Sequence, residues 1–345
     1  MPVQSKNIKL IVKYLLGPVV FCILAVSIYD QLQRQHGWRL SLAAIRASFE
    51  GPRKFNFLWV LLLMFVNWGL EARKWQLSLV HLHRISFFRS FRAVFTGTTM
   101  AFFTPNRIGE YFGRILYIPD GKRIQAVSLT IVCSMAQLLV TLVFGATGLV
   151  FLHKHLFEQA QQPAAVLFWL QLVLWGSIAG SVLLMLFYFK ISWLVRTLEK
   201  LSLPARFLKY IKLLEEFNAT VLLRILSLSG IRYIVFLLQY HLLFEAFGVL
   251  MTPRETILSI SVMFVVLAIA PTIAFLTDLG IRAKASIELV QFFNANVVGI
   301  LATTLGIWVI NLVIPSLIGS LLILGLRLGD FRQRAGQKTN DIVGN

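Results

Sequence analysis

The sequence predicts an all-α integral membrane protein that crosses the bilayer several times, and three observations support this fold class. First, hydrophobic residues make up 57% of the 345 residues and charged residues only 14%, with a mean hydropathy of +0.76, whereas a soluble domain carries about a quarter charged residues. Second, several windows of roughly 20 apolar residues are long enough to span a bilayer as helices. Third, the chain lacks the short alternating segments that are typical of a transmembrane β-barrel.

We expect about seven or eight transmembrane helices plus two broken or re-entrant segments. A helix is expected wherever a long apolar run is bounded by polar or basic residues. The expected helices cover residues 9–32, 56–79, 125–152, 164–189, 231–250, 256–270 and 295–326. Together they are expected to form a single transmembrane domain, residues 1–330, followed by a polar C-terminal tail at residues 331–345.

The positive charge of the chain is expected to lie at the membrane surfaces. The net charge is +18, from 33 Lys and Arg against 15 Asp and Glu, and basic residues flank the apolar runs. Such flanks are typical of the positive-inside bias and of contact with anionic headgroups. We therefore expect a multi-pass protein of the inner (plasma) membrane, with the basic amphipathic insert 190–232 and the C-terminus in the cytoplasm. The mixed segment 34–54 is expected to be an amphipathic helix on the membrane surface.

The first interrupted segment lies at residues 93–117. It is apolar up to Phe103, is broken at Thr104, Pro105 and Asn106, and then regains helical character. Proline removes a backbone donor and biases the preceding residue away from helix. Because each arm is too short to span the bilayer alone, a re-entrant or broken helix is predicted here.

Directly after this break the sequence places three ionisable residues within the apolar region. Arg107, Glu110 and Arg114 are spaced three and four apart, so on a helix they share one face. Ionisable groups at membrane depth are costly and persist mainly where they pair or handle a polar substrate. The spacing therefore predicts a charged site in the membrane interior.

A second break begins at Pro271 and carries a similar charge pair. Asp278 and Arg282 are four apart, as are Glu110 and Arg114, with the acid N-terminal to the base, which is the favourable helical order. Interrupted segments in corresponding regions of two halves are typical of the central site of a transporter and indicate a possible inverted repeat. The alternative is that both are structural ion pairs that lock helix ends together.

These motifs resemble a known family. Residues 106–110 (Asn-Arg-Ile-Gly-Glu), followed by Gly113 and Arg114, resemble a motif of the lysylphosphatidylglycerol synthase transmembrane family, the flippase-like domain of multiple peptide resistance factors. Residues 279–282 (Leu-Gly-Ile-Arg) resemble its second motif, although Thr277 and Asp278 replace the usual glycines. The usual Glu of this motif is replaced by Ala283, and Ala136 and Gln137 stand where the family has Glu-Arg in the long middle helix.

The resemblance implies a flippase-type membrane protein without the soluble domain that attaches amino acids to lipids. We expect it to bind, and to translocate, an anionic amphipathic lipid such as a phospholipid. Arg107, Arg114 and Arg282 would hold the phosphate of the headgroup, because arginine suits bidentate phosphate contacts. Glu110 and Asp278 would neutralise the empty site. The remaining expected site residues, which would allow close backbone approach, are Gly109, Gly113 and Gly280.

Two other functions remain open from the sequence. The first is a membrane-embedded transferase that acts on a lipid-linked substrate, with Glu110 or Asp278 as the base. The second is a non-catalytic scaffold for a neighbouring lipid-synthesis enzyme. The chain contains no nucleotide-binding or hydrolase motif, so we expect no enzyme activity, no cofactor, no bound metal and no nucleic-acid partner.

Overall fold

The computed structural model describes residues 26, 43, 46, 48–51, 53–158, 164–190, 219–270 and 275–324. These residues form helices and connecting turns, with no strand among them, which confirms the predicted all-α fold class. The helices are α3 (Lys54–Ser78), α4 (Phe87–Phe102), α5 (Gly109–Ile115), α6 (Arg123–Glu158), α7 (Ala164–Phe189), α10 (Ala219–Ala246), α11 (Pro253–Ile269), α12 (Phe275–Val290) and α13 (Val297–Trp308).

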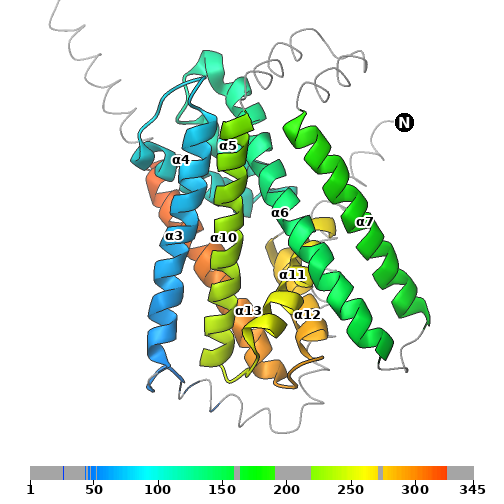
Figure 1. Cartoon of the computed structure of the whole chain (residues 1–345). Helices are drawn as coiled ribbons and strands as arrows, with labels where there is room; N and C mark the ends of the chain where they lie inside the picture. Colours follow the sequence, from blue (N-terminus) through cyan, green and yellow to red (C-terminus); the bar gives the residue numbers. More distant parts are fainter. Residues whose placement is uncertain are drawn as a thin grey trace, which may run out of the picture.

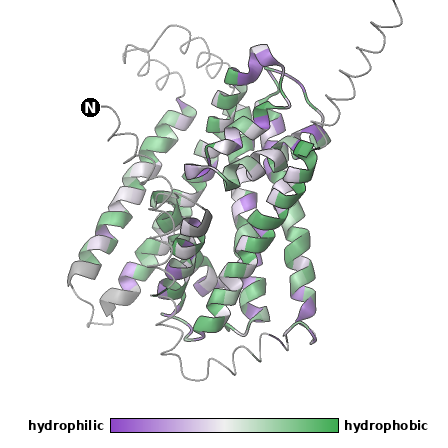
Figure 2. Cartoon of the chain, turned by 180° about the vertical axis from the view of Figure 1, so that it is seen from behind, coloured by the Kyte–Doolittle hydropathy of each residue, from purple (hydrophilic) through white to green (hydrophobic). Residues whose placement is uncertain are grey.

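Five stretches of the described chain are long and apolar enough to cross a membrane. They are Lys54–Ser78, Asp120–Lys154, Leu167–Phe189, Ala219–Ala246 and Val297–Leu324. Hydrophobic colour runs along most of these helices, and hydrophilic colour gathers at their ends and at positions inside the bundle (Figure 2). The chain is therefore a multi-pass membrane protein. The predicted helix at 9–32, most of the surface segment 34–54, residues 191–218, the break at Pro271 and the tail lie outside the described residues.

The helices form one bundle in which the polar site lies between α3, α4–α5, α6 and α10. Helix α3 packs most extensively against α10, and the two run side by side (Figure 1). The core beside the site includes the fully buried Trp75 of α3, Phe95 of α4 and Tyr188 of α7. Helix α7 lies at one side of the bundle against α6, with Phe168, Trp169 and other large apolar side chains exposed. Such a face is suited to contact with lipid.

The prediction for residues 219–232 was wrong. They were expected to end a basic surface insert, but they form the first half of α10, which is a single helix over Ala219–Ala246. Their cations misled the interpretation, because basic residues near apolar runs usually lie at the membrane surface. Arg232 instead lies inside the bundle, with 12% of its side chain exposed.

The predicted interruption after Phe103 is confirmed as a helical hairpin. Helix α4 ends at Phe102, a single 3₁₀ turn over Pro105–Arg107 reverses the chain, and the short α5 packs back along α4. The continuation of α13 then covers α4, where Thr99 Oγ1 donates to the Ser316 carbonyl at 2.7 Å. The final helix thus covers one side of α4, whereas the hairpin tip is exposed, with more than half of the Phe103, Ile108 and Phe112 side chains accessible.

Candidate functional site

The tip of the hairpin has an unusual backbone. Asn106 and Arg107 both have positive φ, +50° and +58°, a conformation that costs non-glycine residues of order 1–3 kcal/mol each. Thr104 secures the turn, because its Oγ1 accepts from the Gly109 amide at 2.7 Å and donates to the Met100 carbonyl at 3.0 Å. The fixed turn places Arg107 at the tip, where 51% of its side chain is exposed and its guanidinium lies 3.8 Å from Glu110.

Two glycines of the predicted site allow the two arms of the hairpin to touch. A Cβ on Gly113 would lie 2.5 Å from the Gly97 Cα, and one on Gly109 would collide with the Met100 carbonyl. Both positions are therefore occupied by the backbone of α4, so these glycines pack the hairpin and do not face an open site. Gly280 is buried in α12 and does not line the cavity described below.

A buried carboxylate on α3 lies at the centre of the site. Glu71 is 4% exposed and forms ion pairs with three cations from three helices. Its Oε2 lies 2.7 Å from Lys74 Nζ and 2.8 Å from Arg232 Nη1, and its Oε1 lies 2.8 Å from Arg114 Nη2. Removing one partner of a buried ion pair leaves an uncompensated charge, which is strongly destabilising. Glu71 therefore ties α3, α5 and α10 together.

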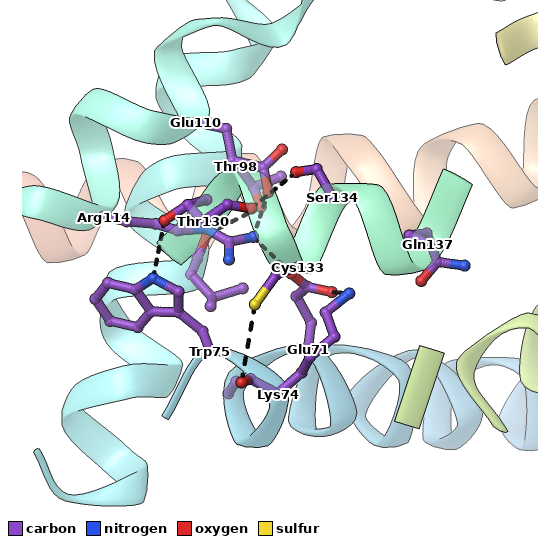
Figure 3. Close-up of polar contacts among 12 residues, drawn as sticks. Glu71, Lys74, Trp75, Thr98, Glu110, Arg114, Thr130, Cys133, Ser134 and Gln137 are labelled. Carbon is purple, nitrogen blue, oxygen red and sulfur yellow. Dashed lines mark hydrogen bonds and ion pairs between the residues drawn. The ribbon is translucent and has the colours of Figure 1, made fainter. Parts of the chain in front are cut away.

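Arg114 is the predicted site residue that lies deepest. Its side chain is 1% exposed and pairs with both Glu110 and Glu71 (Figure 3). The guanidinium lies 6.0 Å from the ring centre of Trp75, whose indole N–H donates to Thr130 of α6 at 3.0 Å. Arg114 Nε and Nη1 have no hydrogen-bond partner among the described residues. This arrangement agrees with the structural alternative for the first pair, because Arg114 locks α5 onto α3.

Arg232 extends the same network toward a cavity. Its Nε donates to Asn67 Oδ1 at 2.6 Å, and its Nη1 lies 3.4 Å from Gln137 Oε1. The guanidinium lies 5.2 Å from the Trp68 ring and 5.5 Å from the Phe236 ring, within the range of a cation–π contact. Packing on one side and hydrogen bonds on the other fix the orientation of this guanidinium at the cavity wall.

The cavity has a volume of about 300 Å³ and lies between the hairpin tip, α3, α6 and α10–α13. The two interrupted segments meet there, because Arg107 from the first and Asp278 and Arg282 from the second all line it. Arg282 Nη2 lies 3.3 Å from Asp278 Oδ2, so the predicted i, i+4 pair is formed. Glu110 and Arg114 do not line the cavity and lie behind it, connected through Glu71 to Arg232.

Several polar atoms at the cavity wall are unsatisfied within the described part of the chain. They are the indole N–H of Trp68, Nε of Arg282 and Oδ1 of Asn311. Asn311 lies in a π-helical turn, Val309–Val313, that interrupts the final helix beside the cavity. Turns of this kind are frequent at functional sites. Buried polar groups require partners, so the cavity wall offers hydrogen bonds to a polar guest.

The charges of the site favour an anionic guest. Asp278 and Arg282 cancel, and the remaining six ionisable groups have a surplus of two positive charges. The positive groups are Lys74, Arg107, Arg114 and Arg232, and the negative groups are Glu71 and Glu110. In a medium of low polarity such a surplus attracts a negatively charged group strongly.

Sequence reasoning missed Glu71 and Arg232 as members of the site. Both stand within helices apolar enough to span a membrane, and an ionisable residue at such a position is itself a signal of function. They were overlooked because each lay close to other charges that indicated a helix end. Their partnership joins positions 161 residues apart, which no local spacing reveals.

The comparison with protein families matches most of the chain. The family model described as the lysylphosphatidylglycerol synthase TM region matches residues 11–319. Neither the curated proteins nor the solved structures give a significant match to the chain.

Proposed function

This chain belongs to the lysylphosphatidylglycerol synthase TM region family, and from this premise we propose that it binds a membrane lipid with an anionic headgroup and moves it across the bilayer. The observation that carries the proposal is the cavity where the two interrupted segments meet. Its wall presents three guanidinium groups, those of Arg107, Arg232 and Arg282. Arginine forms bidentate hydrogen bonds to phosphate, which makes it suited to a phosphate-bearing headgroup.

The remaining wall of the cavity supports an amphipathic substrate. An apolar surface lies in the same cavity as the guanidinium groups. It is formed by Phe102 of α4, Phe236 of α10, Phe264 and Leu267 of α11, and Leu312 of the final helix. A headgroup could bind the arginines while the acyl chains remain among apolar side chains. Binding pockets commonly combine such apolar walls with a few polar groups that orient the ligand.

The acidic partners give the empty site a way to remain neutralised. Asp278 pairs with Arg282, and Glu71 pairs with Arg232, so neither guanidinium at the cavity is buried without a counter-ion. An entering phosphate would compete with these carboxylates for the same N–H donors. Binding would then be reversible, because the carboxylates recover their partners when the headgroup leaves. We propose no bond-making step, and hence no enzyme activity, for these residues.

Reconstitution into liposomes tests the proposal. The purified protein is placed in vesicles containing a fluorescent phosphatidylglycerol, and the fraction accessible to a membrane-impermeant quencher is followed with time. We expect Arg107→Gln combined with Arg282→Gln to slow lipid movement by about tenfold or more, since each change removes a charge-assisted contact. The matched control is Arg92→Gln, an exposed arginine of α4 outside the cavity, which should leave movement unchanged.

Four results would overturn the proposal. Wild-type protein that moves no lipid would contradict it, as would a folded double variant with the wild-type rate. A new covalent product formed on incubation with lipid-linked sugars would replace it with a transferase. Lipid movement that appears only with a stoichiometric partner protein would favour a scaffold.

A further inference from the structure

A second cavity, separate from the arginine-lined one, lies where three helices end. It has a volume of about 740 Å³ and is lined by the end of α6, the start of α11 and the end of α12. These helix ends lie toward the lower side of Figure 1. Basic side chains at the ends of apolar helices, such as Lys154 and Arg254 here, are typical of a membrane surface, so we place the cavity at that level. We refer to it as the α6–α11 groove.

Two cations at the α6–α11 groove are free to bind an anion. Lys154 of α6 and Arg254 of α11 are both exposed, and neither forms an ion pair with a carboxylate in the described part of the chain. Arg254 is held over the Phe151 ring at 5.1 Å, which orients its guanidinium without neutralising it. The nearby Glu255 is occupied in the capping box of α11, where it accepts from the Thr252 amide at 2.7 Å.

The inner part of the groove contains an unsatisfied polar side chain. Ser259, one turn further along α11, is 3% exposed and lines the groove. Its hydroxyl has no hydrogen-bond partner among the described residues. A buried hydroxyl without a partner is uncommon in folded proteins, so it points to a polar atom supplied by a bound molecule.

The walls of the groove distinguish a lipid from a soluble anion. The groove has an apolar lining in addition to the two cations, formed by Phe151, Leu152, Leu258 and Leu289. We propose that the α6–α11 groove binds the headgroup of an anionic phospholipid. The phosphate lies at Lys154 and Arg254, and a headgroup oxygen bonds to Ser259. The part of the acyl chain next to the headgroup lies along the apolar wall. Basic residues next to a membrane-spanning helix attract anionic headgroups, and the groove adds shape and a fixed hydrogen-bond donor.

Native mass spectrometry tests this second site on the full chain in detergent, titrated with phosphatidylglycerol or phosphatidylcholine. We expect Lys154→Gln combined with Arg254→Gln to retain one phosphatidylglycerol fewer than the wild type, with an affinity about tenfold lower. The matched control, Arg84→Gln combined with Arg92→Gln, removes two exposed cations elsewhere and should retain the wild-type number. Ser259→Ala should weaken retention without affecting folding, because its hydroxyl has no described partner.

The outcomes separate this site from the transport proposal. The cavity variant Arg107→Gln with Arg282→Gln should still retain the groove lipid even if it moves no lipid. Equal retention by the groove variant and the wild type would overturn the second site. Equal binding of phosphatidylcholine, or equal thermal stabilisation by glycerol 3-phosphate, would also overturn it, because the groove would then not select an anionic lipid.

Discussion

At the scale of single residues, Glu71 carries most of the electrostatic connection within the site. Lys74, Arg114 and Arg232 each approach its carboxylate within 2.8 Å. Lys74 and Arg232 pair with no other carboxylate among the described residues, whereas Nη2 of Arg114 also contacts Glu110 (Figure 3). The two carboxylate oxygens thus control the orientation of guanidinium groups on two different helices.

Replacing Glu71 with glutamine should therefore destabilise the protein strongly. The change leaves three buried cations with too few counter-charges, and breaking a buried pair in this way typically costs about 3–5 kcal/mol. The measurement is the midpoint of thermal unfolding of the detergent-purified protein. The control is Glu288→Gln, which removes an acid that is 52% exposed and pairs with Lys284, and it should change stability by less than about 1 kcal/mol. Similar midpoints for the two variants would refute the central role of Glu71.

The sequence could predict the local part of this network and not the remainder. The pairs Glu110–Arg114 and Asp278–Arg282 follow from i, i+4 spacing, and both form. Glu71 and Arg232 meet only because α3 and α10 pack side by side, a tertiary contact between distant segments. Gly109 and Gly113 were predicted to lie near a ligand from their positions in the motif alone. In the structure both glycines lie against the backbone of α4.

At the scale of elements, the α4–α5 hairpin positions Arg107 at the cavity. The break at Pro105 was readable from the sequence because proline and its polar neighbours interrupt an apolar run. The direction in which the second arm returns could not be predicted from the sequence, because it depends on the contact between Gly97 and Gly113. The start of α10 was not predicted, because the basic residues there were assigned to the membrane surface.

Separating the arms of this hairpin should destabilise it. Gly113→Ala places a methyl group against the Gly97 backbone, and overpacking of this kind costs about 1–3 kcal/mol. Gly176→Ala is the matched control, because Gly176 is also within a helix but has no atom within 4 Å of the added Cβ; it should be neutral or stabilise by up to about 1 kcal/mol. Proteolysis or thermal unfolding of both variants measures the difference. If the Gly113→Ala variant is as stable as the Gly176→Ala variant, the two arms do not touch.

At the scale of the whole molecule, the fold brings two interrupted segments, far apart in the sequence, to one cavity. The first supplies Arg107 and the second supplies Asp278 and Arg282, while α10 adds Arg232 to the same cavity wall. From the similar charge pairs of the two segments, the sequence predicted that both contribute to one central site. It could not predict that α10 would contribute a third guanidinium, or that the Glu110–Arg114 pair would lie behind the cavity wall.

The most direct test of the shared cavity is a cryo-electron microscopy map of the protein in nanodiscs that contain phosphatidylglycerol. We expect headgroup density in the cavity, within hydrogen-bond distance of Arg232 and Arg282, with the tip residue Arg107 at its edge. A map in which Arg107 and Arg282 lie on separate outer surfaces, or in which protein side chains fill the space between them, would contradict a shared lipid-binding cavity.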